Sequence, residues 1–378
     1  MGEWKREKLG GIEKVKIRKG DGLTSAKMVS GEYPVIAGGM GYCGTHNRFN
    51  RTENTITVSA SGANAGTVLF HKTKIFATDC STIEWGGSEA FLYYSLARRQ
   101  KEFTAMQSGL AQPHVYPKDI EKFVLYYPTL LNEQRRIADI LTSADEAIAA
   151  SRALVEKYTA IKLGLMRDLL GRGEKVSLRK LGGRFIRGQG ITRAEVQDEG
   201  VACIRYGELY TTYNIYINVP KSHVSVEQAK RCFHIKHGDL LFTLSGETAE
   251  EIGKTVVYLG DEECVVGGDI AVFTGHKQNP LYLSYILNAP DALKQKELMS
   301  TGSMVVHINN KKLEKISIPL PPLSEQQRIA NILTSADTSL TSERKHLQKL
   351  ENIKRGLMDD LLTNKVSTNS ILHRNRGR

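Results

Sequence analysis

The chain has 378 residues, which is enough for two or three domains that each bury a core of their own. Five scattered cysteines without a CxxC pair, no apolar segment near the start and no long apolar run argue against a disulfide-stapled, secreted or membrane-spanning protein. A soluble cytoplasmic protein without a membrane partner is expected, and the formal net charge of +11 suits a phosphate-rich partner.

Residues 1–131 are rich in β-branched residues, glycine and tyrosine, as in the run ENTITVSASGANAGTVLFH at 53–71. This texture predicts short strands joined by glycine turns, and the segment carries a net charge of +5. The run GMGYCG at 39–44 satisfies the GxGxxG pattern of nucleotide-binding proteins, but THNRFNRT follows it without a helical period. We therefore interpret it as a glycine-rich loop in a strand-rich domain.

Residues 132–170 predict one long helix, because apolar residues recur at steps of three and four. Asn132 is placed as the N-cap, and Gly171 and Gly173 favour an end just after this segment. Gly164 lies inside the helix, where glycine costs about 1 kcal/mol relative to alanine. We therefore expect close contact with another helix at that glycine.

Residues 172–323 have the same texture as the first domain, for example in GDLLFTLSGETAEEIGKTVVY at 238–258, and predict a second strand-rich domain. The GKT in this run resembles part of a phosphate-binding loop, but Thr248 stands where the first glycine is needed. The two domains share little beyond KLGG at 8–11 and 180–183, the Ser-Gly pairs at 61–62 and 245–246, and IEKF against LEKI before the helices. The two domains therefore share a repeated frame of short motifs, while the sequence between these motifs differs.

Residues 324–362 repeat the first helix without a gap at an offset of 192. SEQQRIANILTSAD at 324–337 matches NEQRRIADILTSAD at 132–145 in eleven of fourteen positions, and GLMDDLL answers GLMRDLL. Ser324 and Gln327 predict a capping box at the start of this helix, and Gly356 repeats the internal glycine. Each helix would span about 58 Å, so the pair would form a rod rather than a compact core.

The two helices are predicted to pair as a coiled coil, because their apolar steps form one seam along each helix. Polar Ser151 and Glu343 occupy the same step, which either fixes the register or leaves the seam loose there, and both interpretations stay open. The other predicted seam residues are Ile137, Leu141, Ala144, Ile148, Val155 and Tyr158 in the first helix and Ile329, Leu333, Ala336, Leu340, Leu347 and Leu350 in the second.

The end of the chain echoes the end of the first helix, since LLTNKVS at 361–367 resembles LLGRGEKVS at 169–177. This echo looks like the start of a third unit. We therefore expect the basic tail to return towards the first domain, with its last residues, HRNRGR, exposed to solvent.

The repeated motifs resemble the specificity subunit of type I restriction-modification systems. They are PTLLNEQRRIADILTSAD and PPLSEQQRIANILTSAD, the GLMRDLL and GLMDDLL ends, and the runs YPVIAGGMGYCG and GDLLFTLSG. The resemblance covers essentially the whole chain and implies an α+β fold. Two mixed α/β, strand-rich target recognition domains at 1–131 and 172–323 would be joined by two long antiparallel coiled-coil helices at 132–171 and 324–363. An internal pseudo-two-fold and a basic tail at 364–378 returning towards domain 1 would complete it.

The same resemblance implies a subunit without chemistry of its own. It would recognise a bipartite, asymmetric sequence in double-stranded DNA, one half per domain, with the helix pair setting the spacing. Its partners would be two methyltransferase subunits and restriction or motor subunits. These partners, and not this chain, would bind S-adenosylmethionine, ATP and magnesium. The chain carries no Asn-Pro-Pro-aromatic or Asp-Pro-Pro-aromatic methyltransferase motif.

No catalytic or metal site is predicted. Cys43 with His46, and Cys232 with His234 and His237, lack the second half that a metal site of this kind needs. We therefore interpret them as ordinary thiols and imidazoles.

Contacts with DNA need side chains that present paired donors and acceptors to bases, or basic groups and backbone N–H groups to phosphates. For any single loop residue a turn role is the simpler interpretation, but as a set some are expected to touch DNA. The candidates in the first domain are Gly41, Tyr42, Thr45, Asn47, Arg48, Ser61, Asn64, Gln107, Ser108, Gln112 and His114. Those in the second are Arg187, Gln189, Arg193, Tyr206, Thr212, Tyr213, Asn214, Ser245, Thr248, Lys254, Thr301, Ser303 and His307.

Two alternatives stay open at this point. A stand-alone, two-headed, sequence-specific DNA-binding regulator would bind its site tightly without a partner. An enzyme built on GMGYCG or IGKT would bind ATP or S-adenosylmethionine and lose that binding on Gly41→Ala or Lys254→Ala.

Overall fold

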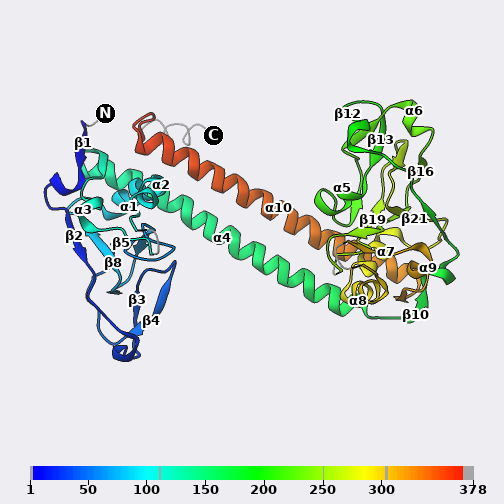
Figure 1. Ribbon diagram of the computed structural model, residues 1–378, viewed down its shortest axis with the longest axis horizontal. Coiled ribbons are helices and arrows are strands. Elements are labelled where there is room, and N and C mark those ends of the chain that lie inside the picture. Colours follow the sequence, from blue (N-terminus) through cyan, green and yellow to red (C-terminus); the bar gives the residue numbers. More distant parts are fainter. Residues whose placement is uncertain (1–2, 110–111, 250, 303–304, 369–378) are drawn as a thin grey trace. The chain divides into compact units, whose positions relative to one another are not determined.

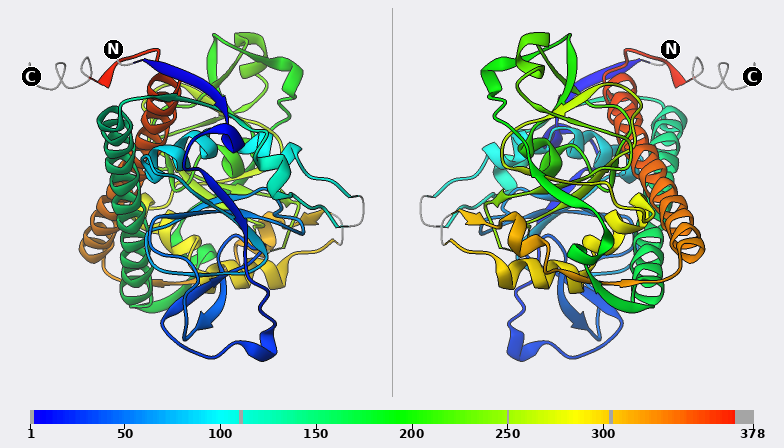
Figure 2. Two further views of the ribbon diagram at one scale, coloured as in Figure 1. Left: turned by 90° about the vertical axis from the view of Figure 1, so that its left-hand side faces the viewer. Right: turned by 90° about the vertical axis from the view of Figure 1, so that its right-hand side faces the viewer.

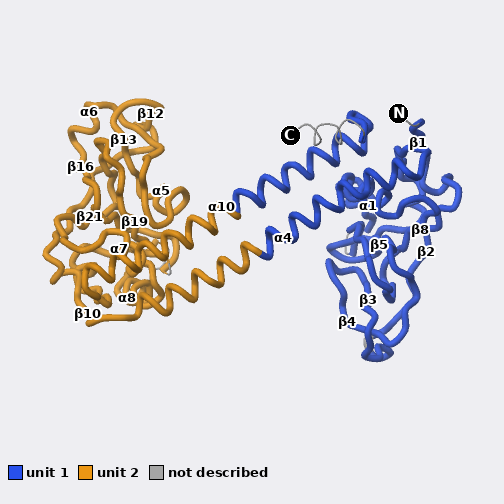
Figure 3. The backbone as a smooth tube through the Cα atoms, turned by 180° about the vertical axis from the view of Figure 1, so that it is seen from behind, with its two compact units in different colours: residues 1–153, 344–378 blue, residues 154–343 orange. Residues whose placement is uncertain are grey.

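Two long helices, α4 (Leu131–Leu170) and α10 (Leu323–Leu362), connect the strand-rich parts of the chain (Figure 1). The computed structural model describes residues 3–109, 112–249, 251–302 and 305–368. The chain forms two compact units, unit 1 with Met1–Ala153 and Arg344–Arg378, and unit 2 with Leu154–Glu343 (Figure 3). Each unit therefore contains one part of α4 and one part of α10. Both predicted helices are confirmed.

Unit 1 is strand-rich, as the sequence predicts. Its strands are β1 (Trp4–Lys8), β2 (Lys16–Lys19), β3 (Tyr33–Ile36), β4 (Tyr42–His46), β5 (Thr55–Ser59), β6 (Val68–His71), β7 (Phe76–Ala77), β8 (Cys80–Glu84) and β9 (Val124–Pro128), and its short helices are α1 (Glu89–Arg98), α2 (Gln100–Ala105) and α3 (Pro117–Ile120). Four of the strands form an antiparallel sheet in the order β2-β8-β5-β6, and a second sheet has the order β4-β3-β7. The β-branched run in β5 is buried along its whole length, which fits a central strand.

Unit 2 is also strand-rich and contains more strands and short helices than unit 1. Its strands are β10 (Glu174–Ser177), β11 (Arg184–Arg187), β12 (Val196–Gln197), β13 (Val201–Ile204), β14 (Tyr216–Ile217), β15 (Ser222–Val224), β16 (Phe233–Ile235), β17 (Leu240–Thr243), β18 (Ser245–Gly246), β19 (Thr255–Tyr258), β20 (Cys264–Val266), β21 (Ile270–Thr274), β22 (Val306–His307) and β23 (Ser317–Leu320). Its short helices are α5 (Tyr206–Thr211), α6 (Val226–Ala229), α7 (Pro280–Leu287), α8 (Pro290–Met299) and α9 (Asn310–Leu313). Two five-stranded sheets have the orders β11-β21-β17-β19-β14 and β12-β15-β13-β20-β16.

The two units share one frame of strands. The order β2-β8-β5-β6 of unit 1 recurs as β11-β21-β17-β19 in unit 2, with every neighbouring pair antiparallel. The second sheet of each unit contains one parallel pair, β3 with β7 and β13 with β20. The units differ mainly between the first and third frame strands, where 35 residues at 20–54 correspond to 52 residues at 188–239. The segments between these strands therefore differ, while the strand frame is the same in both units.

Each core contains the start of one long helix and the end of the other. In unit 1, Leu141 of α4 and Leu361 of α10 lie in one cluster with the strand residues. In unit 2, Leu333 of α10 and Leu170 of α4 do the same. This reciprocal packing explains why both the ILTSAD segment and the GLM ends of the helices occur twice. In the described part of the chain no helix is both long and apolar enough to cross a membrane.

One buried glutamine anchors the start of each long helix, Gln134 in α4 and Gln326 in α10. The Gln134 side chain accepts a hydrogen bond from the Ser88 backbone N–H, and Gln326 accepts one from the Asn279 N–H. Each amide also donates to a carbonyl just before its own helix. Since Ser88 and Asn279 are the N-caps of α1 and α7, the repeated glutamine ties each long helix to a domain helix.

The predicted N-caps Asn132 and Ser324 are wrong. Both helices begin before these residues, which therefore lie in the first turn. Gln327 does not complete a capping box, because its side chain bonds to the side chains of Asn279 and Asn331. The anchoring glutamines, rather than a cap, fix where the chain enters each helix.

The expected close contact at Gly164 and Gly356 is also wrong. A Cβ built on either glycine would meet no neighbouring atom within 4 Å. The packing of the described chain therefore does not require these repeated glycines.

The predicted seam residues are all buried or half-buried, and in each unit the halves of α4 and α10 run side by side in opposite directions (Figure 2). The direction in unit 1 follows from two ion pairs, Asp145 with Lys354 at 2.5 Å and Arg152 with Glu351 at 2.7 Å. Arg152 comes later in α4 than Asp145, whereas its partner Glu351 comes earlier in α10 than Lys354, so the two helices run in opposite directions. The coiled-coil pairing expected from the apolar steps is thus present.

Three elements meet at a polar contact in unit 1. The Tyr94 hydroxyl of α1 donates to Asp145 Oδ2 of α4 at 2.8 Å, and Lys354 Nζ of α10 lies 2.5 Å from Asp145 Oδ1. Burial raises the pKa of Tyr94, which keeps its hydroxyl a donor. We call Tyr94, Asp145 and Lys354 the unit 1 latch.

Unit 2 contains the equivalent latch, made of Tyr285, Asp337 and Lys162. The Tyr285 hydroxyl of α7 donates to Asp337 Oδ2 at 2.8 Å, and Lys162 Nζ lies 2.5 Å from Asp337 Oδ1. The offset of 192 relates Asp337 to the aspartate of the first latch and Lys162 to its lysine. Each unit thus takes the aspartate from the start of one helix and the lysine from the end of the other.

Candidate nucleic-acid interface

A Ser-Gly turn marks the same place in both units, directly after the third frame strand. Ser61 follows β5 and pairs through its backbone with His114, and Ser245 follows β17 and pairs with His307. In the sequence these Ser-Gly pairs are only a short motif that both domains share. In the fold they bring each serine beside a histidine that is 53 or 62 residues later in the chain.

Each histidine forms an antiparallel bridge with a residue six positions earlier and so closes a hairpin, 108–114 in unit 1 and 301–307 in unit 2, of which residues 110–111 and 303–304 lie outside the described part of the chain. Reciprocal backbone hydrogen bonds join Ser108 to His114 at 2.9 and 2.8 Å and Thr301 to His307 at 3.0 and 2.8 Å. The second residue of each hairpin is a glycine with positive φ, +100° at Gly109 and +122° at Gly302, a conformation that glycine adopts without strain. The hairpins are therefore equivalent. Ser303 lies outside the described residues.

An aspartate completes each cluster, Asp79 before β8 and Asp269 before β21. Ser61 Oγ donates to Asp79 Oδ2, whereas Asp269 Oδ1 accepts from Arg187 Nη2 at 2.8 Å. These aspartates are absent from the sequence prediction, because a lone Asp before a strand forms no motif. Equivalent places thus carry different side-chain chemistry in the two units.

The cluster of unit 2 lines an open cleft of about 580 Å³. Ser245 Oγ and His307 Nδ1 are 3.1 Å apart within it. The cleft presents guanidinium, hydroxyl, imidazole, carboxylate, amide and ammonium groups, which is the mixture that base edges and phosphates require. Its lining residues are Arg187, Leu244, Ser245, Asp269, Thr301, His307, Ile308, Asn309, Asn310 and Lys311.

In unit 1 the glycine-rich loop lies beside the cluster. Ser59 Oγ donates to the Gly38 carbonyl at 2.9 Å, and a Cβ on Gly38 would come within 2.8 Å of the Ser61 carbonyl oxygen. The loop then exposes Met40 by 67% and Tyr42 by 70%. Residues 39–41 therefore form a surface loop, as the sequence predicts, whereas Tyr42, Cys43 and Gly44 of GMGYCG belong to β4.

Some predicted residues have internal partners instead. Lys254 Nζ donates to the carbonyls of Tyr210 and Tyr213, and Gln107 Nε2 donates to the Ala65 carbonyl. Tyr213 itself is buried, and its hydroxyl accepts from the Lys221 N–H. These side chains support the loops rather than extend from them.

The remaining predicted residues lie on other loops and strand edges. In unit 1 they are Gly41, Tyr42, Thr45, Asn47 and Arg48 on or next to β4, Asn64 in the turn after Ser61, and Gln112 in the hairpin. In unit 2 they are Gln189 and Arg193 after β11, Tyr206 on α5, Thr212 and Asn214 after α5, and Thr248 after β18.

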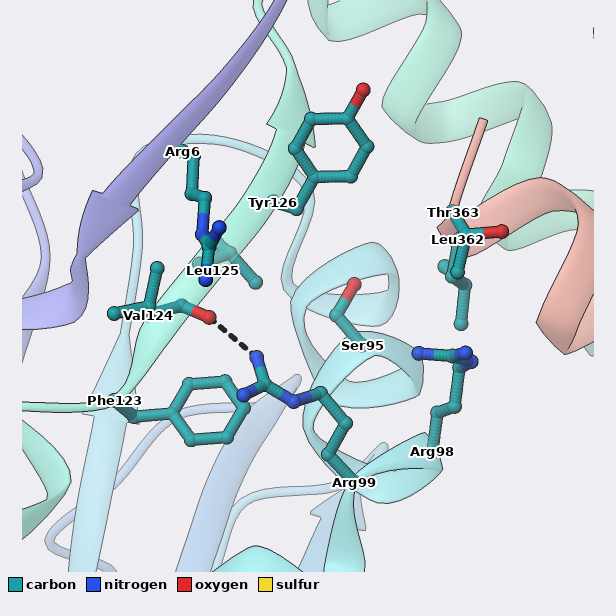
Figure 4. A pocket seen from close by; sticks show the side chains of 10 residues that line it. All are labelled: Arg6, Ser95, Arg98, Arg99, Phe123, Val124, Leu125, Tyr126, Leu362 and Thr363. Atoms are coloured by element: carbon teal, nitrogen blue, oxygen red, sulfur yellow. Dashed lines mark hydrogen bonds between the residues drawn. The ribbon is translucent and has the colours of Figure 1, made fainter. Parts of the chain in front are cut away.

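A cavity of about 440 Å³ lies elsewhere in unit 1, where the end of α10 meets α1 and β9 (Figure 4). Two of its arginines, Arg98 and Arg99, have partners in the protein. Arg99 Nη1 donates to the Val124 carbonyl at 2.5 Å and its guanidinium lies 4.1 Å above the Phe123 ring, while Arg98 pairs with Asp359 at 2.6 Å. Lys365 and Arg98 hold the pKa of Asp359 below its ordinary value. This cavity therefore belongs to the region where the end of α10 is attached to the domain of unit 1.

Two units with one strand frame and different exposed polar clusters, joined to a repeated helix pair, define a two-module recognition scaffold. The family model of the type I restriction modification DNA specificity domain matches residues 1–157 and 192–352, and the chain belongs to this family of DNA sequence-recognition subunits. The resemblance drawn from the repeated motifs is confirmed, and the stand-alone regulator is not favoured.

The chain is also similar to known relatives and, in its fold, to solved structures. The type I restriction enzyme MjaVIII specificity subunit of Methanocaldococcus jannaschii is 24% identical over 357 residues, covering 84% of this chain and 80% of that protein. The crystal structure of the type I restriction-modification S subunit from M. genitalium matches with a TM-score of 0.69 at 17% identity, covering 95% of this chain and 96% of that one. A chain from a structural study of complex assembly and conformational transition of the type I R-M system matches with a TM-score of 0.50 at 17% identity, covering 96% and 97%.

Proposed function

We propose that each unit reads one half of a split, asymmetric sequence in double-stranded DNA, and that the helix pair holds the two readers at a fixed spacing. The observation that carries this proposal is the repeated strand frame with different polar clusters at the Ser-Gly turn. Residues 1–131 and 172–323 would be the recognition domains, with helices 132–171 and 324–363 between them and a tail from 364. The tail lies mostly outside the described residues.

The clusters supply the chemistry for readout in this proposal. The exposed side chains of Ser108, Gln112, Thr301 and His307, with Arg187 in unit 2, can donate to or accept from base edges in the major groove. The basic balance of the domains, +5 in residues 1–131 and +2 in residues 171–323, favours approach to phosphates. The predicted DNA-contacting residues that have no internal partner remain candidates for these contacts.

Modification subunits would dock on the apolar side of the helix pair. In unit 2 the halves of α4 and α10 form a groove of about 490 Å³. Tyr158, Ile161 and Leu165 line it from α4, and Ile332 and Ala336 line it from α10. Such an apolar surface between two helices suits an amphipathic helix of a partner.

The offset of 192 places a matching set of residues on unit 1. Leu350, Ile353 and Leu357 take the positions of the α4 residues, and Ile140 and Ala144 take those from α10. Ile353 is 46% exposed, close to the 43% of its counterpart Ile161. Two equivalent surfaces support the binding of two modification subunits.

The repeated glycines fit this docking. Gly164 and Gly356 lie three residues after Ile161 and Ile353, and therefore on the same helix faces. Their open surroundings would let a partner helix approach closely. S-adenosylmethionine, ATP and magnesium would be bound by the modification and restriction subunits, and this chain would contribute recognition without chemistry.

Co-expression with a type I modification subunit should give a stable complex that methylates adenines in one split sequence. Sequencing of methylated host DNA reports both half-sites and the gap. The double variant Ile161→Glu and Ile353→Glu is expected to abolish complex formation, because it places charge on both grooves. Leu163→Glu is the matched control, since Leu163 is 62% exposed and does not line the groove. A chain that binds no modification subunit, or a complex that methylates without sequence preference, contradicts the proposal.

A further inference from the structure

Helix α5 distinguishes unit 2 from unit 1. It lies in the 52-residue segment between β11 and β17, whereas the corresponding 35 residues of unit 1 form strands, a short 3-10 helix and loops without an α-helix. The end of α5 leads into Thr212 and Asn214, and its first residue, Tyr206, is 44% exposed. The helix is therefore both specific to this unit and accessible.

α5 lies directly against the polar cluster of unit 2. The Tyr210 hydroxyl donates to Thr243 Oγ1 at 2.7 Å and lies 2.9 Å from the Ser245 carbonyl oxygen. A Cβ on Gly246 would come within 3.0 Å of the same hydroxyl. The position of α5 is thus coupled to the Ser-Gly turn that carries the cluster.

Lys254 holds the C-terminal end of α5. Its Nζ donates to the Tyr213 carbonyl at 2.8 Å and to the Tyr210 carbonyl at 3.4 Å. Carbonyls at a helix end lack partners within the helix, and an ammonium group satisfies them while favouring the negative end of the helix dipole. This contact gives the IGKT segment a role unrelated to nucleotide binding.

Lys296 of α8 fixes the segment that carries Lys254. Its side chain is fully buried, and its Nζ donates to the Gly253 carbonyl at 2.5 Å, the Leu287 carbonyl at 2.6 Å and Thr255 Oγ1 at 3.0 Å. Burial lowers its pKa to about 7, and the three oxygen acceptors favour the charged form in this apolar place. The residues on both sides of Lys254 are therefore tied to the end of α7 and to the core.

We propose that α5 selects bases of the half-site read by unit 2, and that Lys254, supported by Lys296, is the residue that positions α5 for this readout. The proposal rests on the proposed function. Helix α5 is then the element that makes the second half-site different from the first. Lys254 and Lys296 act through α5 and need not touch DNA.

The test maps the methylated sequences produced by the complex of the full chain with its modification subunit. Lys254→Met keeps the length of the side chain but removes its donors, and is expected to reduce discrimination at the unit 2 half-site by about tenfold or more. The unit 1 half-site and the gap should not change. Lys254→Arg restores donors and should recover most of the discrimination. Lys230→Met, at an exposed lysine on α6's C-cap, is the matched control.

Direct variants keep the test decisive if Lys254→Met fails to fold. Tyr206→Ala and Asn214→Ala change exposed side chains only, and each is expected to relax the same half-site. Unchanged selectivity in the folded variants, or equal relaxation of both half-sites, would overturn the inference. A wild-type complex that methylates no split sequence would instead overturn the proposed function.

Discussion

Removal of residues 150–156 from α4 together with 342–348 from α10 is expected to shorten the gap between the half-sites by about three base pairs. Seven helical residues span about 10.5 Å, and one base pair rises about 3.4 Å along the DNA axis. A step of seven also keeps the seam in phase, because the apolar residues recur every seven positions. Both half-sites should stay unchanged, which methylated-site mapping checks.

Two controls separate length from general damage. Removal of 150–156 alone leaves helices of unequal length, so the reciprocal packing of starts and ends cannot form in both units. That variant is expected to lose the specific complex. Removal of matched four-residue segments puts the apolar residues before and after the deletion on different faces of each helix, and should therefore destabilise the helix pair. A change in half-site sequence in the matched seven-residue variant would contradict the spacing role.

Lys162→Glu is expected to destabilise unit 2 by about 3 kcal/mol, because it places a second carboxylate beside the mostly buried Asp337. The side chains of Lys162 and Asp337 are only 17% and 13% exposed, so solvent screens them little. Lys354→Glu in the unit 1 latch should have a smaller effect, since Asp145 is 38% exposed there. Chemical denaturation measures both changes.

Arg167→Glu is the control for this prediction. Arg167 lies on the same helix with its side chain 81% exposed, so its substitution should change stability by a few tenths of a kcal/mol at most. The swap of Lys162→Asp with Asp337→Lys should recover part of the loss. Equal effects of Lys162→Glu and Arg167→Glu would show that the latch does not hold the domain to the helices.

Each part of the repeated segment makes a specific contact in its unit. Gln134 anchors the helix start, Leu141 packs in the core, and Asp145 joins the latch. The copy 192 residues later performs the same tasks in unit 2. Fourteen residues are nearly identical because each copy has to meet a domain helix and the end of the other long helix.

The long helices and their seam could be predicted from the sequence because their period is local. Shared KLGG and Ser-Gly pairs indicate that the two domains repeat one frame, but the strand order of that frame could not be predicted, since β5 and β17 share burial and position rather than residues. The Ser-Gly turns at Ser61 and Ser245 were visible, but their pairing with the histidines depends on contacts across more than fifty residues. Such long-range pairs leave no periodic signal.

The errors have similar causes. The caps at Asn132 and Ser324 were predicted from residue type, but tertiary hydrogen bonds of the glutamines determine the entry of each helix. The repeated glycine at Gly164 predicts a contact with another helix of the chain, but its surroundings are open. Lys254 was predicted as a DNA contact by charge, although its ammonium group is held by two carbonyls.

Mapping of methylated sites for the paired variants His114→Ala and His307→Ala tests most directly whether two independent readers share one scaffold. Each histidine closes the equivalent hairpin of its own unit, so each substitution is expected to relax one half-site and to leave the other half-site and the gap intact. If either substitution altered both half-sites together, or if neither altered any, two separate readers on a common frame would not describe this protein.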